Sequence, residues 1–427
     1  MGLRADENSS TKEQLLQLRQ QNELLQQQLR KQQEMIEALG QKVSGLQKTE
    51  EKRQKAAGPS GVEIKEPSAP QSDDSKSLGL SKVHLSGEAG LAFFDSGSNG
   101  RFPNSEFRVD EAKLFLEANV WKDVYLFTEL NIVTREDPNI NVRMGEVYVD
   151  FENVSKLWHQ DRLLNLRVGR MDIPFGEEYQ TRDAIDNPLI SHSLSDIWGV
   201  DEGIELYGTF RNFQYAAAVQ NGGMPALRDF TSDKSFVGRL GFDPVKRLHL
   251  SASAMRTGDV DVKGDKFSEL WFGNGYIRAL GSPATTTRFH ATLFEGDVEV
   301  KLPAGHLKAA GGFINFDDND SAANNQRDVY YYYLEGLHNF TDKFYAAGRF
   351  SQILARQGFP IAGNADFGKY FLQELTEDLW RLSLGAGYRW SRDLVLKAEY
   401  SFEQGEQPNG EKRNHQNLFG VELAVRF

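Results

Sequence analysis

The chain of 427 residues contains no cysteine. This absence excludes disulfides, thiolate metal sites, covalently attached c-type haem and a cysteine nucleophile. The first ten residues (MGLRADENSS) lack the apolar segment of a secretory signal peptide, so we expect the sequence to be a processed form.

Long hydrophobic runs are also missing. No stretch of about 18 or more apolar residues occurs, which excludes a membrane-spanning helix. A transmembrane β-barrel remains compatible with the sequence, because its strands alternate lipid-facing and lumen-facing residues and their average hydropathy is low.

The chain has fewer basic than acidic residues. The net charge is −12, and residues 1–79 hold equal numbers of basic and acidic residues, so the whole excess lies in residues 80–427. A nucleic-acid partner needs a basic surface that displaces counterions, and we therefore expect none.

Motifs for chemistry are scarce as well. The eight histidines form no HxxxH pair and have no carboxylate at ligand spacing, and the sequence holds neither a G-x-S-x-G elbow nor a phosphate-binding loop. We expect no enzyme activity, no cofactor and no metal site.

Residues 1–55 carry a heptad pattern, in which seam positions alternate in steps of three and four. Such a seam predicts a left-handed coiled coil, and its two polar members, Asn22 and Gln32, fix the register. The mixture of Leu and Ile permits two or three strands, and the predicted barrel favours three. The core positions are Leu15, Leu18, Asn22, Leu25, Leu29, Gln32, Ile36, Leu39, Val43 and Leu46. The alternative is a single amphipathic helix packed on a globular domain.

Residues 56–79 are rich in Pro, Gly, Ser and charge, and are predicted to be a flexible linker. From residue 80 the pattern changes to period two, which indicates strands. Sixteen such segments lie near 82–94, 104–120, 121–134, 141–151, 163–171, 201–210, 212–221, 234–243, 246–256, 286–302, 305–316, 327–338, 341–354, 378–390, 393–404 and 414–427.

The connections between these segments alternate in length. Short ones such as 303–305 and 389–393 follow long ones near 95–103, 135–140, 172–200, 221–233, 257–285, 317–326, 355–377 and 405–413. Tight periplasmic turns and longer outer loops are typical of bacterial outer-membrane barrels. We therefore predict an all-β fold, a 16-stranded antiparallel transmembrane barrel over residues 80–427. An even strand count places both chain ends, and hence the coiled coil, in the periplasm.

The two faces of the predicted strands differ in polarity. In the last segment Phe419, Val421, Leu423 and Val425 form an apolar face suited to lipid, opposite Glu422. A lumen lined by charges of both signs has to be wet. The charged residues predicted to line the pore wall are Lys113, Glu117, Arg167, Glu205, Arg239, Arg349 and Arg381.

The stretch LRVGRMDIPFGEEYQTRDAIDNPLI (166–190), followed by DEGIELYG (201–208), resembles the phosphate-selective porin O and P family. The residues that carry the resemblance are Gly169, Arg170, Pro174, Phe175, Gly176 and Glu178. The resemblance implies a sixteen-stranded trimeric barrel whose third outer loop, here 173–200, folds into the lumen. The terminal Phe427 separately resembles the assembly signal of outer-membrane proteins.

Loop 173–200 does not carry the clustered cations that an anion filter requires. We expect its charged residues, Glu177, Glu178, Arg182, Asp183, Asp186 and Asp196, to form an acidic pore constriction facing arginines of the wall. Such a constriction predicts a weak preference for cations. The alternatives are a nearly unselective pore, in which these carboxylates cap turns or pair with wall arginines, and an anion- or phosphate-selective pore.

The function predicted from the sequence is passive diffusion of small hydrophilic solutes and ions. The expected partners are the lipid bilayer of the outer membrane with its lipopolysaccharide, and two further copies in a homotrimer. A second hypothesis is mechanical, with the coiled coil tethering the outer membrane to peptidoglycan or to an inner-membrane partner. A third is a barrel that sheathes a separate electron carrier.

Overall fold

The computed structural model describes residues 83–134, 142–197, 199–222, 231–261, 287–318, 326–359 and 376–427. The predicted coiled coil (1–55) and linker (56–79) lie outside these residues. Sixteen long strands are β1 (Val83–Ser96), β2 (Glu106–Trp121), β3 (Val124–Val133), β4 (Arg143–Phe151), β5 (Asn165–Asp172), β6 (Val200–Phe210), β7 (Phe213–Gln220), β8 (Ser235–Val245), β9 (Leu248–Arg256), β11 (Arg288–Leu302), β12 (Gly305–Asp318), β13 (Arg327–Asn339), β14 (Phe344–Phe359), β15 (Thr376–Ser391), β16 (Leu394–Glu406) and β18 (Leu418–Arg426).

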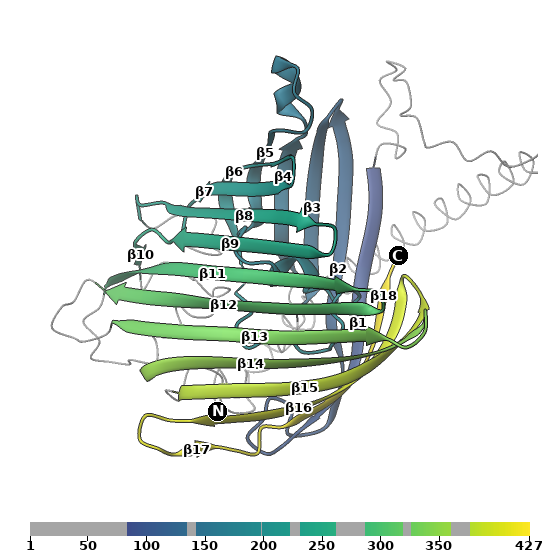
Figure 1. The fold of residues 1–427 in the computed structure, drawn as a ribbon, viewed down its shortest axis with the longest axis vertical. Helices are drawn as coiled ribbons and strands as arrows, with labels where there is room; N and C mark the ends of the chain where they lie inside the picture. The colour runs from purple at the N-terminus through teal and green to yellow at the C-terminus, as the bar shows by residue number, and fades with distance from the viewer. Residues whose placement is uncertain are drawn as a thin grey trace, which may run out of the picture. The chain divides into compact units, whose positions relative to one another are not determined.

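The strands form one antiparallel sheet that closes on itself (Figure 1). Each long strand pairs with its neighbours in the chain, and β1 pairs with both β2 and β18, with Glu88 opposite Arg426. Closure leaves no long strand edge unpaired, which is the condition for a sheet to cross a bilayer. The predicted sixteen-stranded antiparallel barrel is confirmed. Each predicted segment coincides with one long strand, and β10 (Val260–Asp261) and β17 (Lys412–Arg413) are additional short strands.

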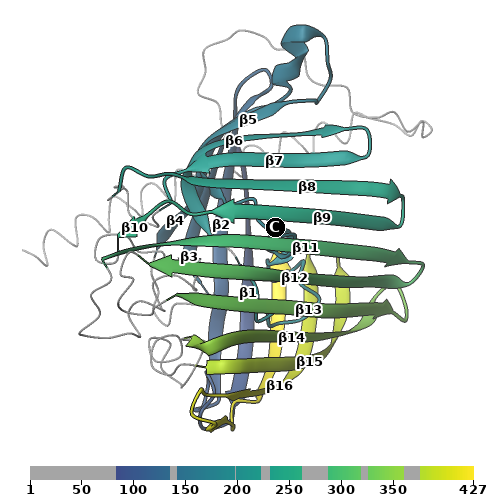
Figure 2. The same ribbon diagram turned by 60° about the vertical axis from the view of Figure 1, so that its left-hand side comes forward.

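The connections alternate in length, as predicted. Only two residues join β2 to β3, β6 to β7, β11 to β12 and β15 to β16, whereas the connections at the opposite end are longer. The longer connection between β4 and β5 on the short side contains the 3₁₀ turn η2 (Val154–Trp158), which projects beyond the strands (Figure 2). Among the described residues no helix is long and apolar enough to span a membrane.

The two faces of the sheet differ in polarity. On β16, Leu396, Tyr400 and Phe402 are exposed on the outer face, while Lys397 and Glu399 are buried on the inner face. Successive residues of a strand point to opposite faces, so the strand register decides which side chains face outward and which face the lumen. The outer face is apolar and the inner face carries the charged residues, which is the pattern of a barrel that crosses a bilayer.

The outer face can be tested at Leu384, in the middle of β15, where the side chain is 50% exposed. We expect Leu384→Arg to lower the free energy of unfolding by about 2–4 kcal/mol, because a cation at the bilayer midplane is poorly solvated. Reversible denaturant unfolding in liposomes measures this cost. The matched control is Gln404→Arg, on the same face of β16 but near its long-connection end, where the cost falls to about 0–1 kcal/mol. Equal costs at the two positions would contradict the assignment of the lipid face.

Candidate pore and its inner loop

The connection between β5 and β6, residues 173–199, is called here the inner loop. It leaves the wall through a turn at Gly176, whose φ of +70° lies in the left-handed region. A Cβ at this position would stand 2.2 Å from Glu295 Oε1 on β11, so both the backbone conformation and the space require glycine. The short 3₁₀ helix η3 (Glu178–Thr181) follows. The glycine therefore brings the loop close against the wall.

Apolar residues anchor both ends of the inner loop. Ile173, Phe175, Leu194 and Ile197 are buried in one cluster with inward-facing side chains of β7 to β15. The wall members of this cluster include Val237, Met255, Phe289, Leu293, Ile314, Phe316, Val329, Tyr331, Ile353 and Leu379. Most of them lie toward the long-connection ends of their strands. The inner loop thus fills this part of the lumen with a dry core instead of leaving it open.

Two neighbouring side chains of β16 hold the middle of the inner loop, and we call this pair the β16 clamp. The Lys397 ammonium is 1% exposed and donates to the carbonyl oxygens of Ala184 at 2.6 Å and Leu189 at 3.1 Å. The Glu399 carboxylate accepts the backbone N–H groups of Ile190 at 2.6 Å and Ser191 at 2.8 Å. The ammonium binds backbone carbonyl groups and the carboxylate binds backbone amide groups, so together they fix one conformation of the loop backbone.

The acidic side chains of the inner loop meet basic partners. Asp183 lies 2.5 Å from Lys113 on β2, and Asp186 lies 2.6 Å from Arg426 on β18. The remaining pairs are Glu177 with Arg239 at 3.3 Å, Glu178 with Arg349 at 3.9 Å, and Asp196 with Arg182 at 2.7 Å. The structure therefore presents these carboxylates as ion-paired groups, the arrangement that the sequence left as an alternative to an acidic constriction.

Burial and a nearby charge shift the pKa of Asp183 in opposite directions. Burial by itself raises the pKa of its carboxyl group, but the nearby Lys113 ammonium outweighs burial and lowers the pKa to about 2. A carboxyl group whose pKa is lowered on folding stabilises the fold above its ordinary pKa, and the contribution is lost as the pH falls toward 2. The ion pair between Asp183 and Lys113 thus persists through the neutral and mildly acidic range.

The predicted wall residues fall into two groups. The first group touches the inner loop. It includes Lys113 and Arg239, through the ion pairs described above. Arg349 and Arg381 also belong to it: Arg349 donates to the Ser191 carbonyl at 2.7 Å and Arg381 to the His192 carbonyl at 3.3 Å. Each arginine also pairs with a wall carboxylate, Glu335 and Glu403 respectively. They position the loop as well as line the barrel.

The second group lies away from the inner loop. Arg167 on β5 pairs with Asp150 at 3.2 Å and with Glu205 at 3.1 Å. Glu117 is exposed on the inner face of β2, two residues beyond Phe115. This part of the wall, on β2 to β6, contributes no member to the apolar cluster that anchors the loop.

Lys397 and Glu399 are not among the site residues predicted from the sequence, although the alternation of apolar and polar residues along β16 is consistent with their place on the inner face. No local signal distinguishes them from other inward charges, because their partners are backbone groups about 210 residues earlier in the chain. Arg426, which pairs with Asp186 and Glu88, was missed for the same reason.

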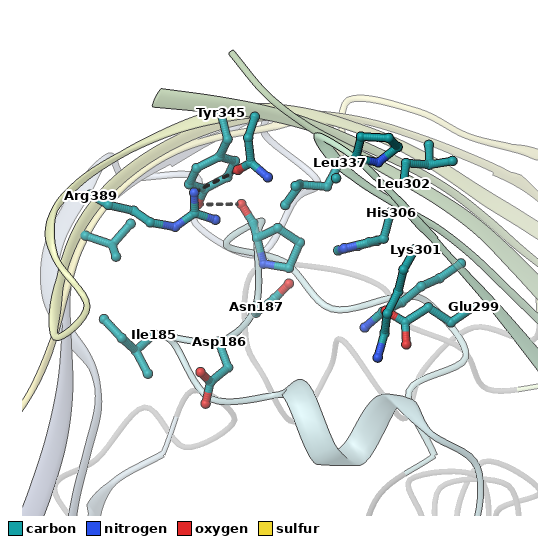
Figure 3. Close-up of a pocket in the computed structure, with 16 residues that line it drawn as sticks. Ile185, Asp186, Asn187, Glu299, Lys301, Leu302, His306, Leu337, Tyr345 and Arg389 are labelled. Carbon is teal, nitrogen blue, oxygen red and sulfur yellow. Dashed lines mark hydrogen bonds between the residues drawn. The ribbon is translucent and has the colours of Figure 1, made fainter. Parts of the chain in front are cut away.

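A cavity of about 490 Å³ lies between the inner loop and the short-connection ends of β11 to β16. Figure 3 shows Ile185, Asp186 and Asn187 of the loop across from Lys301 and His306. Tyr345 donates from its hydroxyl to the Pro188 carbonyl at 3.0 Å and so closes one side. The cavity shows that the loop leaves space beside the wall at this end.

The β16 clamp can be tested with a cysteine reporter, because the chain has no thiol of its own. In an Ala184→Cys background, where the native side chain is 1% exposed, we expect slow labelling by a water-soluble maleimide. Lys397→Met should speed labelling at least about tenfold, because each lost charge-assisted hydrogen bond contributes about 1.5–3 kcal/mol.

The matched control is Lys412→Met, which removes an exposed lysine paired with Glu406. We expect it to leave the labelling rate of the Ala184→Cys reporter unchanged. Heat-modifiable electrophoretic mobility reports whether each barrel is folded. A folded Lys397→Met barrel that labels at the original rate would show that the clamp does not hold the loop.

No family model and no curated protein sequence matches this chain. Solved structures do match, among them OmpT of Vibrio cholerae, with 12% identity, a TM-score of 0.53, and coverage of 81% of this chain and 97% of that one. The outer membrane channel DcaP of Acinetobacter baumannii matches with 12% identity, a TM-score of 0.51 and coverage of 81% and 97%. An anion-selective porin from Comamonas acidovorans matches with 10% identity, a TM-score of 0.50 and coverage of 81% and 98%.

At this level of identity the likeness concerns the fold, and the likeness to the phosphate-selective porin O and P family remains a resemblance of sequence. The closed sixteen-stranded barrel with an apolar outside and a charged inside has the porin architecture.

Proposed function

We propose that the chain is an outer-membrane porin that lets small hydrophilic solutes and ions diffuse passively, with a weak preference for cations, and that it is not an enzyme. The observation that carries this proposal is the closed barrel with a charged inner face and an inner loop that occupies only part of the lumen. A barrel of about 16 strands leaves an aqueous channel unless something fills it.

The proposed cation preference comes from the wall of β2 to β6. Its inward carboxylates, Glu111, Glu117, Glu129, Asp150 and Glu205, outnumber the inward cations Arg108, Lys113 and Arg167. The paired carboxylates of the inner loop add little net charge. The anion-selective porin from Comamonas acidovorans shares the barrel, so the fold alone does not set the sign of selectivity. Side chains along the open path decide it.

Single channels in a planar bilayer test both parts of the proposal. We expect conductance above background, grouped in threes, and a reversal potential under a KCl gradient that indicates cation preference. Glu117→Lys should move the reversal potential toward anions, because it replaces an exposed lumenal carboxylate by an ammonium. The outward, half-exposed Tyr400→Phe serves as control. Absence of conductance would contradict the pore, and an anion preference of the native protein would contradict the proposed selectivity.

We also propose that the chain forms a homotrimer held by the coiled coil over residues 1–55. The support is the heptad seam from Leu15 to Leu46. The solved OmpT of Vibrio cholerae includes a trimer form. The same segment motivates a second function, a tether from the outer membrane to peptidoglycan or to an inner-membrane partner, because a pore needs neither a rod nor a linker.

Deletion of residues 1–79 separates these roles. We expect the truncated barrel to conduct as a single unit with the native conductance per pore, and sedimentation or cross-linking to show loss of the trimer. If the tether operates, cells that carry the truncation should also leak periplasmic contents and become sensitive to detergent. An intact trimer after truncation would contradict the role of the seam, and an intact envelope would contradict the tether.

A further inference from the structure

Rings and one guanidinium form a continuous row across the inner face of β2 to β6. Phe115 and Phe127 stack with ring centroids 6.0 Å apart, and Phe127 and Tyr148 stack at 5.2 Å. The Arg167 guanidinium lies 4.3 Å from the Tyr148 ring centroid and 4.9 Å from that of Tyr207. We call these five residues the aromatic track. Five adjacent strands each contribute one member, so the track follows the wall around the lumen.

Strand register places the aromatic track on the inner face. Phe115 pairs in register with Glu129 of β3. It also lies two residues from Lys113, whose ammonium contacts Asp183 of the inner loop. Phe127 pairs with Glu117 and Tyr148. On the other face of the same strands, Leu116 and Leu130 are exposed and apolar. The track therefore lines the lumen, whereas those leucines face outward.

The inner loop leaves these rings uncovered. Inward aromatics on the far wall, from β11 to β14, are almost wholly buried: Phe289, Phe316, Tyr331, Tyr333 and Tyr345 are 2–5% exposed. Each ring of the aromatic track is only half-buried, and none belongs to a buried apolar cluster. Partly exposed aromatic faces in a wet lumen can gain free energy by burying apolar area against a solute.

Negative charge surrounds the aromatic track. Glu117 is exposed beside Phe127, its register partner, while Arg167 is neutralised by Asp150 and Glu205. Arg167 itself shows that the ring faces of Tyr148 and Tyr207 accept a cation. An aromatic face attracts cations through its quadrupole, and adjacent carboxylates strengthen that attraction. An anion would meet repulsion from the same carboxylates.

We propose that the aromatic track is a binding surface for organic cations, specifically ammonium groups that carry apolar or aromatic substituents. The inference rests on the proposed pore, because it assigns a solute class to the lumen. The ammonium would lie over Phe127 with Glu117 alongside, and the substituent would contact Phe115 or Tyr148. Organic cations would thereby dwell in the lumen longer than ions of the same charge that lack apolar surface.

Benzyltrimethylammonium is a suitable probe, with benzyl alcohol and benzoate as its neutral and anionic counterparts. In single-channel recordings in KCl we expect benzyltrimethylammonium to block the current at lower concentration than either counterpart. Phe127→Leu keeps an apolar side chain but removes the ring face, and should raise the blocking concentration about two- to fivefold. Adding Phe115→Leu should raise it further.

The matched control is Phe402→Leu, which removes an outward ring on β16 that is 40% exposed and should leave both conductance and block unchanged. Equal block by all three probes, or an unchanged blocking concentration in Phe127→Leu, would overturn the inference. Calorimetric titration of the detergent-solubilised protein measures binding without relying on conduction. Conduction of KCl without binding of the probe would contradict the aromatic track alone, whereas binding without conduction would support the track and contradict the proposed pore.

Discussion

The structure depends on one constraint, the closure of the sheet through pairing of β1 with β18. Once Glu88 stands opposite Arg426, every long strand has a partner on both sides and its register is fixed. Side chains must then alternate between two very different surroundings, a continuous outer surface and an enclosed lumen. A slip of one residue would put Lys397 and Glu422 on the lipid side, so the charges themselves help to enforce the register.

Closure also creates the problem that the inner loop solves in part. An empty sixteen-stranded barrel would expose apolar inward residues such as Ile314 and Ile353 to water. The loop covers them with Ile173, Phe175 and Leu194, and the resulting core is dry. Hydrophobic burial fixes the ends of the loop, whereas the β16 clamp and the ion pair between Asp183 and Lys113 fix its middle. These polar contacts lie in the lumen, where the protein excludes much of the water that would weaken them.

The inner loop covers only part of the barrel wall, so the lumen has two different sides. From β7 to β15 the inner face packs an apolar core against the loop. From β2 to β6 it contacts the loop through polar groups such as Lys113, and it carries accessible rings and more carboxylates than cations. The proposals about solutes concern this second side. An ion on the open path meets the field of those carboxylates, while the carboxylates of the inner loop itself are ion-paired and contribute little.

Alternation of apolar and polar residues, together with the alternation of short and long connections, determined the strands, their number and the faces of residues such as Leu396 and Lys397. These features are local, and period two leaves few alternatives once the strands are long. The pairing of Asp183 with Lys113, of Asp186 with Arg426 and of Glu399 with the loop backbone could not be predicted, because the partners are remote in sequence and meet only when the barrel closes. The sequence thus showed where charge lies along each strand, and the tertiary structure alone decided which charges neutralise one another and which rings stay open to the lumen.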